Sequence, residues 1–310
     1  MLVATLLSVI AAAAVPTPAP PAPSPPPVTT SHYMSTVDPG RVYDMGCFQA
    51  TRNISGIAVL SFGRPMYDAA SKSYGVNLYH GNFTPIAKIQ SAVEAYLDGY
   101  WNCLPAASNE TLQLGVGTTN YSYDGPAKPG WVTREHGIAW AQMIVALAND
   151  VQAKGYAAHL TVLGADDMEP SWSPAPATRA WVDGYASITR IPLVNFGSAD
   201  GCPPYGTCNN GWTPEDVWYV SEGSGVSETF PEIYTGSGAQ AKEWYNLSLY
   251  GAVHHNRPIH FLGAWTQYQA ADLCCTLNPQ EAFAQLSSAL NADPRTAQTL
   301  QYASDITWAN

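Results

Sequence analysis

The sequence predicts an α/β fold, a single (β/α)8 TIM-like barrel with one or more irregular βα units. Strand-like apolar runs alternate with segments of helical periodicity, which is typical of a parallel sheet covered by helices. Eight candidate strands and the length of residues 33–310 fit one such barrel. A doubly wound open sheet is the alternative, but the glycines at 115–117 and 236–238 lack the third glycine of a phosphate-binding fingerprint.

The expected strands are short runs of apolar and β-branched residues that end at glycine, proline or asparagine. The first, at residues 56–62, reads Gly-Ile-Ala-Val-Leu-Ser-Phe and runs into Gly-Arg-Pro. The connection after the fifth strand is short enough to lack a helix. In chain order the eight strands are expected at residues 56–62, 112–117, 160–163, 191–196, 216–220, 231–235, 259–265 and 305–308.

The expected helices carry apolar side chains every three or four residues. In the first, Ile89, Val93 and Leu97 show this spacing. Asn278 and Glu281 supply the N-cap and capping-box acid of the last helix, with a proline at its first position. The helices are expected at residues 86–101, 140–151, 177–187 and 238–254 and after residue 278.

The N-terminus predicts an exported, secreted protein. Residues 1–14 form an apolar run that ends in Ala12-Ala13-Ala14 and read as a signal peptide, although its basic region is missing. Residues 15–32 read as a proline-rich linker, and residues 33–310 as the barrel domain. An uncleaved membrane anchor is the alternative, but no later segment is apolar enough for stable membrane insertion.

The cysteines also favour an oxidising compartment. Six are present, which allow 15 pairings, and none forms a Cys-x-x-Cys motif, so a zinc knuckle or thioredoxin-like site is disfavoured. The expected pairs are Cys202–Cys208, Cys47–Cys103 and the vicinal Cys274–Cys275.

Composition narrows the class of ligand. The net charge is −11 and no basic patch is present, which excludes nucleic acid as an expected partner. The 10 tryptophans and 18 tyrosines suit stacking on the faces of sugar rings. We expect a monomer that uses neither a metal nor another cofactor.

The strand at residues 160–163 runs directly into three acids, Asp166, Asp167 and Glu169, before Pro170 stops it. Side chains alternate along a strand, so Asp167 and Glu169 share one face about 6–7 Å apart, and Asp166 faces the other way. Two such carboxylates suit acid/base work because crowding pushes their pKa values apart. Alternatively, Asp166 caps the next helix, or the acids bind Ca²⁺.

Barrel enzymes take their functional groups from the carboxyl ends of strands. Each such residue has a simpler interpretation: Arg64 pairs with a local acid, Tyr234 and Trp265 pack at the rim, and Glu222 is a solvated loop charge. No His-Glu-x-x-His or Gly-x-Ser-x-Gly motif is present, which disfavours zincins and α/β-hydrolases. From their positions at or just after strand ends, the residues expected to bind substrate are Asp166, Trp172, Arg64, Asn195, Tyr234, Trp265 and Gln267.

The Asp167-x-Glu169 strand end, in an exported chain, resembles the catalytic strand of family 25 lysozyme-like glycoside hydrolases. It also resembles the glycoside-hydrolase-like barrels of exported bacterial cell-wall proteins. The resemblance implies hydrolysis of peptidoglycan or another extracellular polysaccharide. Glu169 then maps to the general acid, and Asp167 to the group that stabilises an oxocarbenium-like or oxazolinium species, unless it acts as nucleophile or water base.

Two other functions remain open at this point. One is a non-catalytic barrel that binds wall glycan or another surface ligand, in which Arg64 or backbone amides satisfy the acids. The other is a hydrolase of an amide or ester bond, in which the acids hold a metal. Fold analogy does not choose between these.

Overall fold

The computed structural model describes residues 24–270 and 275–309. Eight strands of the described chain form one parallel sheet in the order β10-β11-β1-β2-β6-β7-β8-β9. Parallel bridges from Thr229 to Phe261 and from Glu232 to Trp265 join its two edges, so the sheet closes into a barrel and the expected fold class is confirmed. The strands are β1 Val28–Met34, β2 Gly56–Ser61, β6 Leu112–Thr119, β7 Leu160–Asp167, β8 Leu193–Asn195, β9 Ser227–Thr229, β10 Gly263–Thr266 and β11 Tyr302–Ala309.

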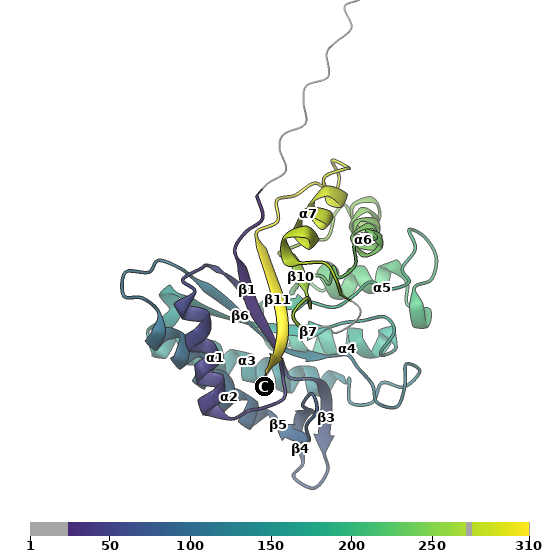
Figure 1. Ribbon diagram of the computed structural model, residues 1–310. Coiled ribbons are helices and arrows are strands. Elements are labelled where there is room, and N and C mark those ends of the chain that lie inside the picture. Colours follow the sequence, from purple (N-terminus) through teal and green to yellow (C-terminus); the bar gives the residue numbers. More distant parts are fainter. Residues whose placement is uncertain (1–23, 271–274, 310) are drawn as a thin grey trace, which may run out of the picture.

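Helices surround this barrel, and the first and last strands lie side by side, as Figure 1 shows for the purple β1 and yellow β11. The capping box expected at Asn278 and Glu281 begins the last helix. None of the helices in the described ranges is long and apolar enough to cross a membrane. The α-helices are α1 Pro39–Thr51, α2 Ile86–Cys103, α3 Arg134–Ala153, α4 Ala175–Ala186, α5 Pro214–Trp218, α6 Ala239–His255 and α7 Pro279–Leu290.

The hydrophobic core has two parts because strand side chains alternate between the barrel interior and the helix layer. On β2, Ile57 and Val59 belong to the interior cluster, whereas Ala58 and Leu60 pack under the helices. Gly117 on β6 faces inward, and a Cβ there would lie 2.9 Å from the ring of Phe196. The glycine therefore leaves space for a large aromatic ring in a narrow interior.

The first strand of the barrel was not expected. β1 begins at Val28, so the boundary expected at residue 33 falls inside a strand. Its first two inward side chains are small and polar: Thr29 donates to the carbonyl of Ile57, and Ser31 accepts from the amide of Val59 at 2.9 Å. These hydrogen bonds to β2 satisfy the buried hydroxyl groups of β1. A search for apolar runs does not detect such a polar strand.

The strand expected at residues 216–220 is wrong. Residues Pro214–Trp218 form α5, followed by one π-helical turn at Tyr219–Gly223. Thr213 and Asp216 form a reciprocal capping box, with bonds of 3.2 and 3.1 Å, and Pro214 occupies the first helical turn. This helix-start chemistry overrides the β-branched and aromatic residues that follow it.

Other expected strands are shifted. The run at residues 231–235 contributes only the bridge at Glu232, because the strand itself, β9, lies just before it. A separate antiparallel sheet, β3 Arg64–Asp68, β4 Ser73–Asn77 and β5 Phe83–Pro85, is inserted between β2 and α2. In Figure 1 this sheet lies at the end of the barrel where β11 finishes, so it covers part of the carboxyl-terminal mouth.

Two of the expected disulfides are confirmed. Cys47–Cys103 ties α1 to α2, and Cys202–Cys208 closes a loop that follows β8. The expected Cys274–Cys275 pair, the expected signal peptide and most of the expected linker involve residues outside the described ranges.

Candidate active site

Strand β7 carries the candidate catalytic acids to the mouth of the barrel. Leu163, Ala165 and Asp167 have the same parity, and the first two lie in the interior cluster, so Asp167 also faces inward. The strand ends there, and the next turn is held by Asn120 at the end of β6. The amide side chain of Asn120 accepts from the backbone N–H of Glu169 at 2.9 Å and donates to its carbonyl at 3.0 Å.

A third carboxylate joins the two that the sequence predicted. One oxygen each from Asp167, Glu169 and Glu232 lies within 4.8 Å of the others. Glu232 reaches this point because its backbone bridges to Trp265 and its N–H donates to the carbonyl of Gly197. Asp167 and Glu169 thus lie close together, as the sequence predicted, although the strand ends at Asp167 and the chain does not continue as a strand to Glu169.

The acid cluster, meaning Asp167, Glu169 and Glu232, has little to stabilise negative charge. Asp167 is 2% exposed and Glu232 is 4% exposed, and Glu169 is mostly buried. No lysine, arginine or histidine of the described chain forms an ion pair with any of them. One carboxylate oxygen of Asp167 also has no hydrogen-bond partner within the described ranges.

These surroundings favour the protonated forms. Burial, and then the charges of neighbouring acids, raise the pKa values of Asp167 and Glu232 well above their usual range. Burial and the charge of Asp200 raise the pKa of Glu169 to about 8. Like charges this close cannot all ionise together, so the cluster retains at least one proton at neutral pH.

Tyrosine hydroxyls surround the cluster. Burial raises the pKa values of Tyr33, Tyr79 and Tyr234, and the charges of Glu232 and Asp167 raise them further. These phenols therefore stay neutral and can donate hydrogen bonds.

A pocket of about 370 Å³ opens beside the cluster. Its walls include Tyr79 and Thr119, and Thr119 lies directly opposite Asp167 in the sheet. Trp172 and Tyr121 meet edge to face at 5.6 Å on another side. The inserted sheet supplies much of the remaining wall. The pocket thus places aromatic surfaces at the carboxyl end of the barrel, where barrel enzymes bind substrates, although none of the three acids is among the residues that line it.

The structure places five predicted site residues here, one of which is Tyr234 beside Glu232. Asp167 and Glu169 belong to the acid cluster, and Arg64 and Trp172 line the pocket beside it. Arg64 does not pair with a local acid among the described residues, contrary to the simpler interpretation of it.

The other predicted residues lie behind or beside the site. Asp166 faces away from the interior and is buried, and Asn195 donates to Ser221 and holds the N–H of Gly197, so neither reaches the pocket. Trp265 is 0% exposed and packs 6.0 Å from Tyr234, so it supports the tyrosines without touching substrate. Gln267 lies at the edge, where its side chain accepts from the hydroxyl of Tyr33 at 3.4 Å.

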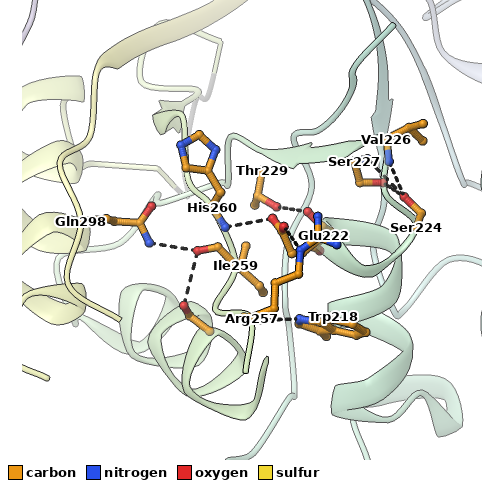
Figure 2. Close-up of polar contacts among 12 residues, drawn as sticks. Trp218, Glu222, Ser224, Val226, Ser227, Thr229, Arg257, Ile259, His260 and Gln298 are labelled. Carbon is orange, nitrogen blue, oxygen red and sulfur yellow. Dashed lines mark hydrogen bonds and ion pairs between the residues drawn. The ribbon is translucent and has the colours of Figure 1, made fainter. Parts of the chain in front are cut away.

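Glu222 lies elsewhere and is not a solvated loop charge. It is buried, and its carboxylate accepts from Arg257 Nε at 2.6 Å and from the backbone N–H of His260 at 3.1 Å. Figure 2 shows these contacts, with Trp218 donating to the carbonyl of Arg257. Glu222 therefore anchors the loop before β10. It has a cationic partner, whereas the acids of the cluster have none among the described residues.

Sequence reasoning overlooked Glu232 and gave Asp200 no role. A signal for Glu232 was present, because it shares strand parity with Tyr234, which the sequence did place in the site. Asp200 sits in the loop after β8, and only the folded chain shows that its charge acts on both Glu169 and Glu232.

No protein-family model matches the chain, and no curated protein matches it. The resemblance to family 25 lysozyme-like hydrolases therefore stays a prediction. Among solved structures, the endo-1,4-β-mannanase of Rhizomucor miehei is 9% identical, with a TM-score of 0.41 over 94% of this chain and 87% of that one.

Two other solved structures show similarly weak likeness. The endo-β-1,4-mannanase of Thermotoga petrophila is 10% identical, with a TM-score of 0.41 over 92% of this chain and 68% of that chain. The pyruvate carboxylase of Rhizobium etli is 11% identical, with a TM-score of 0.37 over 90% of this chain and 23% of that chain. Similarity at this level assigns no activity to the chain.

Proposed function

We propose that the protein is an exported glycoside hydrolase that acts on cell-wall or other extracellular polysaccharide. One observation carries this proposal: Asp167, Glu169 and Glu232 come together beside an aromatic-lined pocket. No lysine, arginine or histidine of the described residues forms an ion pair with these three acids. Had the barrel served only to bind ligands, we would expect Arg64 or backbone amides to satisfy these acids. The two disulfides support an oxidising, extracellular compartment.

Glu169 is proposed as the general acid. Its raised pKa, about 8, keeps it protonated at neutral pH, so it can donate to the glycosidic oxygen as the bond breaks. It is also the most exposed member of the acid cluster, which suits contact with substrate. Asn120 fixes the turn that carries it, so the carboxyl group starts from one position.

Asp167 and Glu232 are proposed to stabilise the positive charge that develops at the anomeric carbon. The distance between the carboxyl groups bears on whether the anomeric configuration is retained or inverted. Retaining glycosidases place their two carboxyl groups about 5–5.5 Å apart, whereas inverting enzymes need about 6.5–9.5 Å to admit a water molecule. Oxygen atoms within 4.8 Å of each other support the shorter arrangement and retention of configuration.

The test is hydrolysis of a panel of peptidoglycan and extracellular polysaccharides, measured as release of reducing ends. Wild type is compared with Glu169→Gln and Asp167→Asn, and with Glu135→Gln as a control at an exposed acid on α3. Product release that disappears in the two site variants but persists in the control supports the proposal. If no polysaccharide is cleaved by folded wild type, the proposal fails.

One observation favours a second candidate. Three carboxylate oxygens at this spacing could also hold a divalent cation such as Ca²⁺ or Mg²⁺, which prefer oxygen ligands. The protein would then be a metal-dependent hydrolase of a glycosidic, amide or ester bond. Its activity would require the cation, whereas the proposed glycosidase acts without one.

A further inference from the structure

Arg64 differs from the other partly buried arginine of the described chain. Arg179 lies over the ring of Tyr219 at 4.1 Å and forms an ion pair with Asp216 at 2.8 Å. Arg64 lies over the ring of Tyr123 at 4.6 Å in the same manner, yet no described carboxylate lies within 4.0 Å of its guanidinium group. Its Nε is buried and has no hydrogen-bond partner in the described ranges.

This arginine sits where two pockets meet. The pocket beside the acid cluster and a second one of about 140 Å³ share Arg64 and Tyr121 in their walls. Trp172 lies in the first pocket, and Tyr123 and Trp131 lie in the second. The two pockets therefore adjoin each other at Arg64 and Tyr121, and together they are here called the aromatic groove.

The rings of the groove are unusually accessible. Tyr121 and Trp131 are each 41% exposed and Tyr123 is 75% exposed, although most large aromatic residues of the described chain are buried or partly buried. Aromatic bodies with polar tips suit sugar rings, which present apolar faces and hydroxyl edges. Tyr79 links the first pocket to the acid cluster, so a chain cleaved there would continue past Arg64.

We propose that the aromatic groove binds a glycan that carries carboxylate groups and that Arg64 holds one of these carboxylates. This inference rests on the proposed function, whose substrate class it narrows to acidic polysaccharide. A planar guanidinium group recognises a carboxylate through two parallel hydrogen bonds, and leaving its buried Nε unpaired is costly. Asp124 also lines the second pocket but does not pair with Arg64.

Contacts at Arg64 must provide the selectivity for acidic glycans. The chain has a net charge of −11, so its overall field does not attract polyanions. The Arg64 guanidinium group is held against Tyr123, so less side-chain freedom is lost when it binds an anion.

The experiment measures binding separately from turnover, by calorimetry on the Glu169→Gln protein. The probes are oligogalacturonate and solubilised peptidoglycan strands, each compared with its carboxyl-methylated form, and mannohexaose and cellohexaose as neutral glycans. We expect at least one acidic probe to bind about tenfold or more tightly than its methyl ester, as one charged hydrogen-bond pair provides. Arg64→Met should abolish this difference, and Arg190→Met, at an exposed arginine without a described partner, should retain it.

Three results would overturn the inference: no acidic probe binds, methylation has no effect, or Arg64→Met keeps the preference. Methionine preserves the apolar contact with Tyr123, so folding is not expected to suffer, and circular dichroism checks this. An Arg64-dependent preference without hydrolysis by wild type would overturn the proposed function but leave the acidic-glycan site standing. If wild type hydrolyses glycans at a rate that depends neither on their charge nor on Arg64, the acidic-glycan site is overturned and the proposed function stands.

Discussion

Asp167 and Glu232 present carboxylate oxygens within 4.8 Å of each other although a third strand, β8, separates the strands that lead to them. Both side chains are buried, and the charge of Asp167 raises the pKa of Glu232 beyond the effect of burial. Apolar packing does not explain such a pair, because each ionised member makes the other more costly. The barrel keeps two repelling acids beside Glu169, and groups with perturbed pKa values in this way are typical of catalytic sites.

Glu232 should matter as much as the two acids that the sequence identified. Removing a group that stabilises transition-state charge costs about 10²–10³ in kcat. We expect Glu232→Gln to lose activity by that factor while its circular dichroism spectrum stays unchanged. Kinetics on the best polysaccharide of the panel measure this. Activity within a factor of two of wild type would remove Glu232 from the mechanism.

The stereochemistry of cleavage follows from the short spacing of the acid cluster. A covalent glycosyl-enzyme intermediate requires the two carboxyl groups to lie close together, and such reactions retain the anomeric configuration. Proton NMR of the first product formed by wild type should show the same anomer as the substrate. If the opposite anomer forms first, Asp167 and Glu232 do not act at the distance that the structure gives them.

Stability should fall as pH rises. Burial raises the pKa of Glu169 from 4.5 to about 8, so between these values the folded protein holds a proton that the unfolded chain has lost. The free energy of unfolding then decreases by about 1.4 kcal/mol per pH unit for each such group. Urea unfolding between pH 5 and 8 should show a smaller decrease in Glu169→Gln than in wild type. Parallel curves would contradict the raised pKa.

Glu222 offers a matched control for that measurement. Its carboxylate is buried like the acid cluster but accepts bonds from Arg257 and His260 (Figure 2). Glu222→Gln should therefore lower the free energy of unfolding at pH 8, by about 1 kcal/mol or more, whereas Glu169→Gln should raise it. Changes of the same sign in both variants would indicate a general effect of replacing glutamate.

Removal of divalent cations separates the two candidate functions. An acid/base glycosidase needs no metal, so we expect EDTA to leave the rate of hydrolysis unchanged. Ca²⁺ or Mg²⁺ at 1 mM should also leave the melting temperature unchanged, since a ligand that binds only the folded state would raise it. Loss of activity on chelation, restored by one cation, would favour the metal-dependent hydrolase.

Much of the fold could be predicted because strand and helix periodicities are local. β2, β6 and β7 are apolar runs and were found at nearly the right positions. The count of eight strands was correct, but one expected strand is the helix α5 and one real strand, β1, was missed. Both errors arise where polar contacts decide the structure: a capping box in one, and buried hydroxyl groups in the other.

The acid cluster could be predicted only where its residues adjoin one another in sequence. Asp167 and Glu169 follow a single strand, whereas Glu232 reaches them through barrel closure, a long-range event that no local pattern reports. Trp265 misled for a related reason. Its position at a strand end was inferred correctly, but its side chain points into the packed interior of the barrel and is not exposed to substrate.

The most direct test of the proposed mechanism asks whether Glu169 protonates the leaving group. Glu169→Gln should lower kcat/KM on polysaccharide by about 10²–10⁴ but by less than about tenfold on 2,4-dinitrophenyl glycosides, whose leaving group needs no proton. That contrast would identify Glu169 as the general acid. An equal loss on both substrates, or no loss on either, would contradict its role.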